Sequence, residues 1–273
     1  MRLIALDLDG TLLNREKSVS PRNRAALLAA AELGHHIVPA TGRALRAIPE
    51  PVLALPFVRY VISINGANVA DLQTGRTLLC AEIPGPRALE LLDFVARYDA
   101  MYDCYWQNTG WIDRDFLERV REYNADEEVV RLIQTTRTPV ENLRAFISSR
   151  AETVQKVQLC FHDLRARSAA ADEIAARFPD IAVTSSFRNN LELNWKDANK
   201  GSALRFLARH LGLAQADTIA FGDSSNDLSM LAAAGTSVAM GNAAPEVRAV
   251  CDAVTETNEE DGVAVYLEQN LLI

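Results

Sequence analysis

Short apolar runs alternate along the first third of the chain with longer segments that mix apolar and polar residues. Residues 3–8 (LIALDL) stay apolar until an acid interrupts them, which is typical of a strand buried on both faces of a parallel sheet. Ser20 and Pro21 then open an alanine- and leucine-rich segment that a glycine closes after Leu33, and this punctuation predicts a helix. Two further strand-like runs follow, at residues 36–40 and 60–64. The alternation predicts an α/β fold with a doubly wound parallel sheet.

The pattern changes after Ile83, where Pro84-Gly85-Pro86 forms a linker-like cluster. Aromatic strand-like runs on either side of the QNTG segment at 107–110 predict a hairpin, and charged helical segments follow. The strand–helix rhythm resumes near residue 189. We therefore expect a catalytic core made of residues 1–83 and 189–273, with residues 84–188 forming an inserted α+β cap domain.

Composition narrows the possible classes of protein. The 273 residues are 49% hydrophobic and 23% charged, as in ordinary globular proteins, and the four widely spaced cysteines form no CxxC pair. A formal net charge of -8 disfavours nucleic acid and anionic lipid as partners. No apolar run is long enough to span a bilayer, so we expect a soluble, cytoplasmic protein without a membrane partner. The sequence does not indicate an oligomeric partner.

Polar clusters stand where several predicted strands end. They are Asp7 to Thr11, Thr41-Gly42-Arg43, Asn65-Gly66 and Asp223 to Asp227. Because the carboxyl ends of parallel strands meet at one crevice of an open sheet, we expect these clusters to share a site.

Four carboxylates would meet in that site, from Asp7, Asp9, Asp223 and Asp227. Two bare charges 4 Å apart repel by about 4 kcal/mol at an effective dielectric near 20, so a cation is expected among them. Magnesium suits a few carboxylate oxygens and bridges to a phosphate group. With Lys200 and Thr41 as donors to phosphoryl oxygens, the residues suggest phosphoryl transfer with Mg2+ as cofactor.

The motifs DLDGTLL, ATGR, Lys200-Gly201 and GDSSND resemble, in this order, the four motifs of the haloacid dehalogenase (HAD) superfamily. The segments FGDSSNDLSMLAAAG, VAMGNA, EDGVA and NGA are similar in finer detail to its Cof-like (class IIB) sugar-phosphate phosphatases. The resemblance covers the whole core, whereas the inserted residues match the family's cap only in position and size.

The resemblance implies a role for each matching residue. Asp7 would be the nucleophile that becomes an aspartyl-phosphate, and Asp9 the general acid and base. Thr41 and Lys200 would hold the transferring phosphoryl group. The remaining assignments are substrate binding by Gly42, Arg43, Asn65 and Asn226, and metal binding by Asp7, the backbone carbonyl of Asp9, Asp223 and, directly or through water, Asp227.

These roles predict a hydrolase of small phosphorylated metabolites, with sugar phosphates as the expected substrates. A phosphomutase or phosphotransferase on the same scaffold is an alternative, and a non-catalytic phosphosugar-binding regulator is another. Lys196 competes with Lys200 for the role of phosphate-binding lysine, because the stretch before Lys200 lacks the proline and glycine usual in the family. The cap would select the leaving group.

Overall fold

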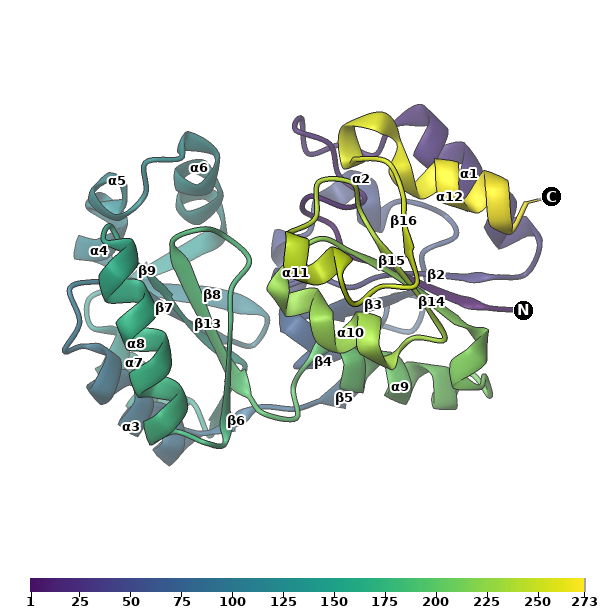
Figure 1. Ribbon diagram of the computed structural model, residues 1–273. Helices are drawn as coiled ribbons and strands as arrows, with labels where there is room; N and C mark the ends of the chain where they lie inside the picture. The colour runs from purple at the N-terminus through teal and green to yellow at the C-terminus, as the bar shows by residue number, and fades with distance from the viewer. Residues whose placement is uncertain (273) are drawn as a thin grey trace. The chain divides into compact units, whose positions relative to one another are not determined.

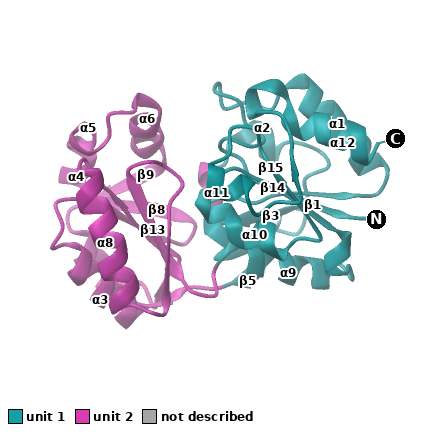
Figure 2. Cartoon of the chain, viewed as in Figure 1, with its two compact units in different colours: residues 1–43, 48–80, 199–273 teal, residues 44–47, 81–198 magenta. Residues whose placement is uncertain are grey.

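The computed structural model describes residues 1–272 and divides the chain into two compact units (Figure 2). Unit 1 contains residues 1–43, 48–80 and 199–273, and unit 2 contains residues 44–47 and 81–198. Among the described residues, no helix is both long and apolar enough to cross a membrane.

Unit 1 is built on a five-stranded parallel sheet with strand order β16-β15-β14-β1-β2. Strand β1 lies between β14 and β2 and has no exposed side chain, which explains the uninterrupted apolar run at the start of the chain. The strands are β1 (Leu3–Leu6), β2 (His36–Pro39), β14 (Thr218–Gly222), β15 (Thr236–Ala239) and β16 (Ala253–Val254). The predicted parallel α/β fold is confirmed.

Helices cover both faces of this sheet (Figure 1). The packed helices α1 (Pro21–Glu32) and α12 (Gly262–Asn270) lie on one side, and α9 (Lys200–His210) and α10 (Leu228–Ala233) on the other. Helix α1 begins as its sequence predicts, since the side chain of Ser20 accepts a hydrogen bond from the backbone N–H of Asn23 at 3.1 Å. Two short helices complete the unit, α2 (Glu50–Leu53) and α11 (Pro245–Arg248).

The run at residues 60–64 lies parallel beside β2, as expected, but it also begins a small antiparallel sheet. Strand β3 (Tyr60–Ser63) pairs antiparallel with β4 (Asn68–Asp71), which pairs with β5 (Arg76–Cys80). Isolated parallel bridges, Ile37 to Val58 and Ala40 to Ile62, tie this small sheet to β2 and the chain that follows it. The β3–β4 connection is too short for a helical crossover, so the two strands can pair only as an antiparallel hairpin.

Unit 2 is an α+β unit with a six-stranded sheet in the order β12-β13-β11-β7-β8-β9. All neighbours are antiparallel except β8 and β9. The predicted hairpin is present, and its two turn residues Gln107 and Asn108 have φ of 51° and 56°, as a two-residue turn requires. The strands are β7 (Met101–Trp106), β8 (Thr109–Asp113), β9 (Arg137–Val140), β11 (Lys156–Cys160), β12 (Ile181–Thr184) and β13 (Asn190–Trp195), with β6 (Ile83–Pro84) and β10 (Thr153–Val154) forming a separate pair.

Strand β13 corrects the predicted domain boundary. Residues 189–198 were expected in the catalytic core, but β13 pairs with β11 and β12, and unit 2 extends to Ala198. The apolar side chains of Leu191 and Leu193 belong to the hydrophobic core of unit 2. Because Asn190, Glu192 and Asn194 alternate with them, β13 has the polar–apolar alternation of an antiparallel strand rather than the continuous apolar run of a parallel one.

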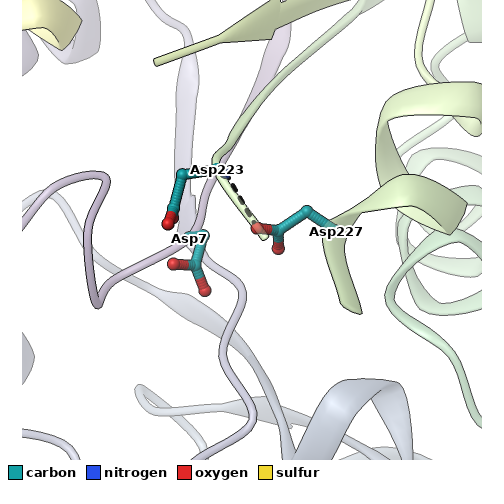
Figure 3. A group of neighbouring side chains, drawn as sticks. All are labelled: Asp7, Asp223 and Asp227. Atoms are coloured by element: carbon teal, nitrogen blue, oxygen red, sulfur yellow. Dashed lines mark hydrogen bonds between the residues drawn. The ribbon is translucent and has the colours of Figure 1, made fainter. Parts of the chain in front are cut away.

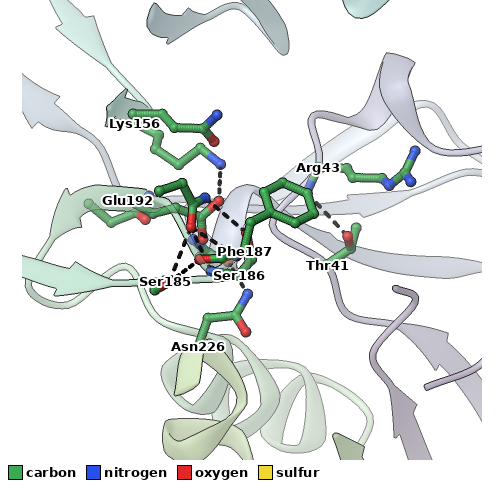
Figure 4. A network of polar contacts seen from close by, with 12 residues as sticks. Thr41, Arg43, Lys156, Ser185, Ser186, Phe187, Glu192 and Asn226 are labelled. Carbon is green, nitrogen blue, oxygen red and sulfur yellow. Dashed lines mark hydrogen bonds and ion pairs between the residues drawn. The ribbon is translucent and has the colours of Figure 1, made fainter. Parts of the chain in front are cut away.

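The two faces of the unit 2 sheet differ. One packs against α3 (Gly85–Val95), α7 (Leu143–Arg150) and α8 (Leu164–Arg177). The opposite face carries Met101 and Cys160, which form a second apolar cluster with α4 (Arg114–Glu118), α5 (Val120–Tyr123) and α6 (Glu127–Thr136). This opposite face also carries buried ion pairs. Arg137 Nε lies 2.7 Å from Asp103 Oδ2, and Lys156 Nζ lies 2.7 Å from Glu192 Oε1 (Figure 4). Pairing is what allows these charges to be buried.

Candidate active site

Strands β1 and β14 bring the two acidic segments together. They pair in register, with Leu6 opposite Phe221, and the backbone N–H of Asp7 donates to the carbonyl of Phe221 at 3.1 Å. The residues that follow the two strands therefore emerge side by side at the carboxyl edge of the sheet, although they are over two hundred positions apart in sequence.

A fully buried lysine connects two of the acids. The ammonium nitrogen of Lys200 lies 2.6 Å from Oδ1 of Asp7 and 2.6 Å from Oδ1 of Asp227. Lys200 is the first residue of α9, and Asn199 caps that helix by accepting a hydrogen bond from Ser202 at 2.8 Å. This N-terminal cap fixes where α9 begins, and therefore the direction from which the Lys200 side chain enters the cluster.

The carboxylates of Asp7, Asp223 and Asp227 are close enough to share one ion (Figure 3). Each offers an oxygen within 4.8 Å of the others. Asp227, however, uses Oδ1 for Lys200 and Oδ2 for the backbone N–H groups of Asp223 and Ser224, both at 3.0 Å. Asp223 accepts from the hydroxyl groups of Thr11 and Ser224, both at 2.9 Å. The arrangement suits Asp7 and Asp223 for direct contact with a hard cation, whereas both oxygens of Asp227 are engaged by Lys200 and the backbone.

The acidity of the cluster is strongly perturbed. Burial raises the pKa of Asp7 well above its ordinary value; the charge of Asp227 adds to this effect and the ammonium of Lys200 opposes it. Burial, with the charge of Asp227, also raises the pKa of Asp223 to about 7. Burial alone would lower the pKa of Lys200, but Asp227 and Asp7 hold it above its ordinary value. Crowded carboxylates with raised pKa values are the environment that a bound Mg2+ would stabilise, so the donor set fits this ion.

Gly10 permits the close approach of the two acidic segments. Its φ is +85°, and a Cβ atom at this position would lie 2.6 Å from Oδ2 of Asp223. A side chain here would therefore be strained and would also displace the carboxylate.

Asp9 lies beside the cluster, bound by two cations. Arg43 holds it with two hydrogen bonds of 2.7 Å, Nε to Oδ2 and one terminal nitrogen to Oδ1, and Lys17 Nζ lies 3.2 Å from Oδ1. Burial would raise the pKa of Asp9, but the bonds and charge of Arg43, together with Lys17, lower it below its ordinary value. The sequence predicts Arg43 as a substrate ligand, and the structure shows in addition that it pairs with Asp9.

The remaining predicted residues surround the same edge of the sheet. Thr41 is buried and accepts a hydrogen bond from the backbone N–H of Arg43 at 3.1 Å, with Gly42 between them (Figure 4). Asn226 Nδ2 donates to Asn65 Oδ1 at 3.2 Å. Thr41 and Asn65 are also joined, by a backbone hydrogen bond of 3.0 Å. Lys196, the rival of Lys200, lies on the exposed turn after β13 in unit 2.

Comparison with known proteins agrees with this geometry. The model of the haloacid dehalogenase-like hydrolase family matches residues 4–267. The chain therefore belongs to this family, and the resemblance to its Cof-like branch is confirmed.

Similar proteins have been named as phosphatases. The chain is 35% identical over 290 residues to phosphatase YwpJ of Bacillus subtilis, with 100% of both chains covered. It is 30% identical to 5-amino-6-(5-phospho-D-ribitylamino)uracil phosphatase YwtE of the same organism, covering 99% of this chain and 98% of that one. A solved haloacid dehalogenase-like hydrolase from B. subtilis superimposes with a TM-score of 0.85 at 32% identity, covering 99% and 100% of the two chains. The chain is an HAD-type phosphatase.

Sequence reasoning missed two features of the site. No sequence motif predicts the contact of Lys17 with Asp9, because Lys17 lies in a loop beyond the DLDGTLL segment. The ion pair of Arg43 with Asp9 could have been suspected, since both follow neighbouring parallel strands. Opposite charges at adjacent strand ends are within reach of a long arginine side chain.

Proposed function

We propose that this phosphatase is magnesium-dependent and hydrolyses small phosphorylated metabolites, with sugar phosphates as the expected class, through a phosphorylated Asp7. The observation that carries the proposal is the grouping of Asp7, Asp223 and Lys200 at the carboxyl ends of β1 and β14. A nucleophilic carboxylate, a second carboxylate for a metal ion and a buried ammonium group are what phosphoryl transfer through an aspartate requires.

In this mechanism Asp7 attacks phosphorus with Oδ2, while Lys200 holds Oδ1. The leaving oxygen takes a proton from Asp9, and Asp9 then removes a proton from the water that hydrolyses the aspartyl-phosphate. Lys200 and Thr41 donate to the equatorial phosphoryl oxygens, so that the developing charge meets preorganised donors.

Magnesium would be held by Asp7, the backbone carbonyl of Asp9 and Asp223, with Asp227 orienting Lys200 and the 223–224 backbone. When bound, the ion supplies charge neutralisation to the attacking carboxylate and the phosphoryl group. Gly42, Arg43, Asn65 and Asn226 are proposed to bind substrate from the same edge of the sheet. The name of YwtE, a relative that matches over its whole length, refers to a phosphorylated ribityl compound, which supports a polyhydroxylated phosphate ester as substrate.

The experiment that tests this function measures phosphate release from a panel of sugar phosphates, other phosphorylated metabolites and p-nitrophenyl phosphate. Wild type and Asp7→Asn are compared in Mg2+ and in EDTA. We expect release that needs Mg2+ and disappears in the variant, which retains the shape of Asp7 but not its nucleophilic charge. Phosphate release by wild type in EDTA, or by Asp7→Asn in Mg2+, would contradict the proposal.

A further inference from the structure

A loop after the DLDGTLL segment presents a lysine to the proposed general acid. Residues 14–18 form a closed turn: the N–H of Asn14 donates to the carbonyl of Ser18 at 3.1 Å, and the N–H of Lys17 donates to the carbonyl of Asn14 at 2.9 Å. The Asn14 side chain accepts from both the N–H and the hydroxyl of Ser18, at 2.9 and 3.0 Å. These hydrogen bonds hold the backbone of residues 14–18 in one conformation.

That shape is unusual at Lys17. Its φ is 56°, in the left-handed region that glycine or asparagine occupies readily and that a long side chain rarely adopts. Such strain persists only where the surroundings impose it, and it is concentrated at functional positions. Here the surroundings include anchors outside the turn: the carbonyl of Leu13 accepts from Asn258 Nδ2 at 2.8 Å, and the N–H of Arg15 donates to Glu259 at 2.9 Å.

The strained backbone directs the Lys17 side chain to Asp9. Its ammonium nitrogen lies 3.2 Å from Oδ1, the oxygen that one terminal nitrogen of Arg43 also contacts at 2.7 Å, while Arg43 Nε holds Oδ2. Arg43 thus fixes the plane of the carboxylate, and Lys17 holds one of its oxygens from a second element. The Lys17 side chain is 41% exposed, so the contact is not a consequence of burial in a core.

We propose that Lys17 is a positioning residue for Asp9, and that with Arg43 it holds the carboxylate in one orientation beside the acidic cluster. The inference rests on the proposed role of Asp9 and assigns to Lys17 no contact with the reacting atoms. It predicts that Lys17 matters most where the leaving group needs a proton, as an alkoxide does and p-nitrophenolate does not.

Four variants test the assignment. Lys17→Met removes the charge and keeps the stem, whereas Lys17→Arg keeps a cation. Lys17→Gly removes the charge but suits a φ of 56°, so a loss of activity without a loss of thermal stability cannot come from a damaged loop. Glu16→Gln changes an exposed charge in the same turn and is the matched control.

With the best sugar phosphate of the panel, we expect kcat of Lys17→Met and Lys17→Gly to fall by about 3- to 30-fold with KM within about twofold. With p-nitrophenyl phosphate the fall should be several times smaller, while Lys17→Arg and Glu16→Gln should stay near wild type. An equal loss with both substrates, or a change confined to KM, would overturn the positioning role.

Crystal structures of wild type and Lys17→Met provide a readout that needs no turnover. We expect the Asp9 carboxylate to occupy one orientation in wild type and more than one in Lys17→Met. An unchanged single orientation in the variant would overturn the inference even if the phosphatase activity is as proposed. Conversely, a wild type that releases no phosphate would remove the proposed function, while the two crystal structures would still decide whether Lys17 orients Asp9.

Discussion

The ammonium nitrogen of Lys200 lies 2.6 Å from Oδ1 of Asp7, with both side chains buried. A carboxylate in a buried position is costly unless a counter-charge is close, and Lys200 supplies it to Asp7 and Asp227 together. The lysine therefore has two roles in the proposed mechanism. It stabilises the folded cluster, and it orients the nucleophile.

Replacing Lys200 should affect both properties. For Lys200→Met we expect kcat to fall by at least about 10²-fold, because a preorganised donor to the phosphoryl group is lost. In EDTA the free energy of unfolding should fall by about 3 kcal/mol, because two buried carboxylates lose their partner. Phosphate release and urea denaturation measure the two effects. Lys196→Met is the control; if it, rather than Lys200→Met, abolished activity, the phosphate-binding lysine would be misassigned.

Asp223 and Asp227 should differ in their effect on metal affinity. Asp223→Asn removes a proposed ligand, so the dissociation constant for Mg2+ should rise by more than about 10²-fold. Asp227→Asn disturbs Lys200 and two backbone N–H groups, and the rise should be about tenfold, with the larger effect on stability. Isothermal titration calorimetry compares the two variants. Equal losses of affinity would place Asp227 among the direct ligands.

The stability of the metal-free protein should depend on pH through Asp223. Its pKa is about 7 in the folded protein against an ordinary 3.8, so the folded state binds the proton more tightly. From about pH 4 to about pH 7 this group therefore lowers the free energy of unfolding as pH rises, by up to a few kcal/mol. Urea denaturation of wild type and Asp223→Asn in EDTA isolates the effect.

Magnesium should reverse this trend, because a bound cation favours the ionised carboxylate. With saturating Mg2+, the free energy of unfolding of wild type, relative to that of Asp223→Asn, should no longer fall as pH rises. If the two proteins keep parallel stability curves in EDTA, the raised pKa of Asp223 is refuted.

Gly10 and Gly34 form a matched pair, since both have a φ of +85°. A Cβ atom at Gly34 would meet nothing within 4 Å, whereas at Gly10 it would lie 2.6 Å from Oδ2 of Asp223. Both alanine variants should lose about 1 kcal/mol of stability from backbone strain. Gly10→Ala should in addition weaken Mg2+ binding and activity, which Gly34→Ala should leave unchanged. Normal Mg2+ affinity in Gly10→Ala would contradict the proposed role of this contact.

In unit 2, replacing one member of the Arg137–Asp103 ion pair should destabilise the fold more than replacing both. Both side chains are almost fully buried. Arg137→Met alone should lower the free energy of unfolding by about 3–5 kcal/mol, because it leaves the carboxylate without its cation. Adding Asp103→Leu should recover most of that loss. Chemical denaturation of the single and double variants measures it, and a double variant no better than the single one would be the contrary result.

The sequence predicted the strands, the helix punctuation and the identity of the clustered acids well, because each leaves a local pattern. Ser20 and Pro21 mark the start of α1, and the apolar run of β1 ends at Asp7. The sequence indicated less clearly which strands pair and which side chains meet. That β13 joins β11 and β12, or that Lys17 reaches Asp9, depends on contacts between distant segments, for which one strand or one loop carries no local signal.

The pairing of β1 with β14 also bears on how the protein folds. Leu6 and Phe221 are neighbours in the sheet but are separated by most of the chain, and unit 2 is synthesised between them. During synthesis on the ribosome, β1 cannot pair with β14 until the more than one hundred residues of unit 2 have emerged. Contacts of such long sequence separation form slowly, so we expect acquisition of the site to be a late event in the maturation of the nascent chain.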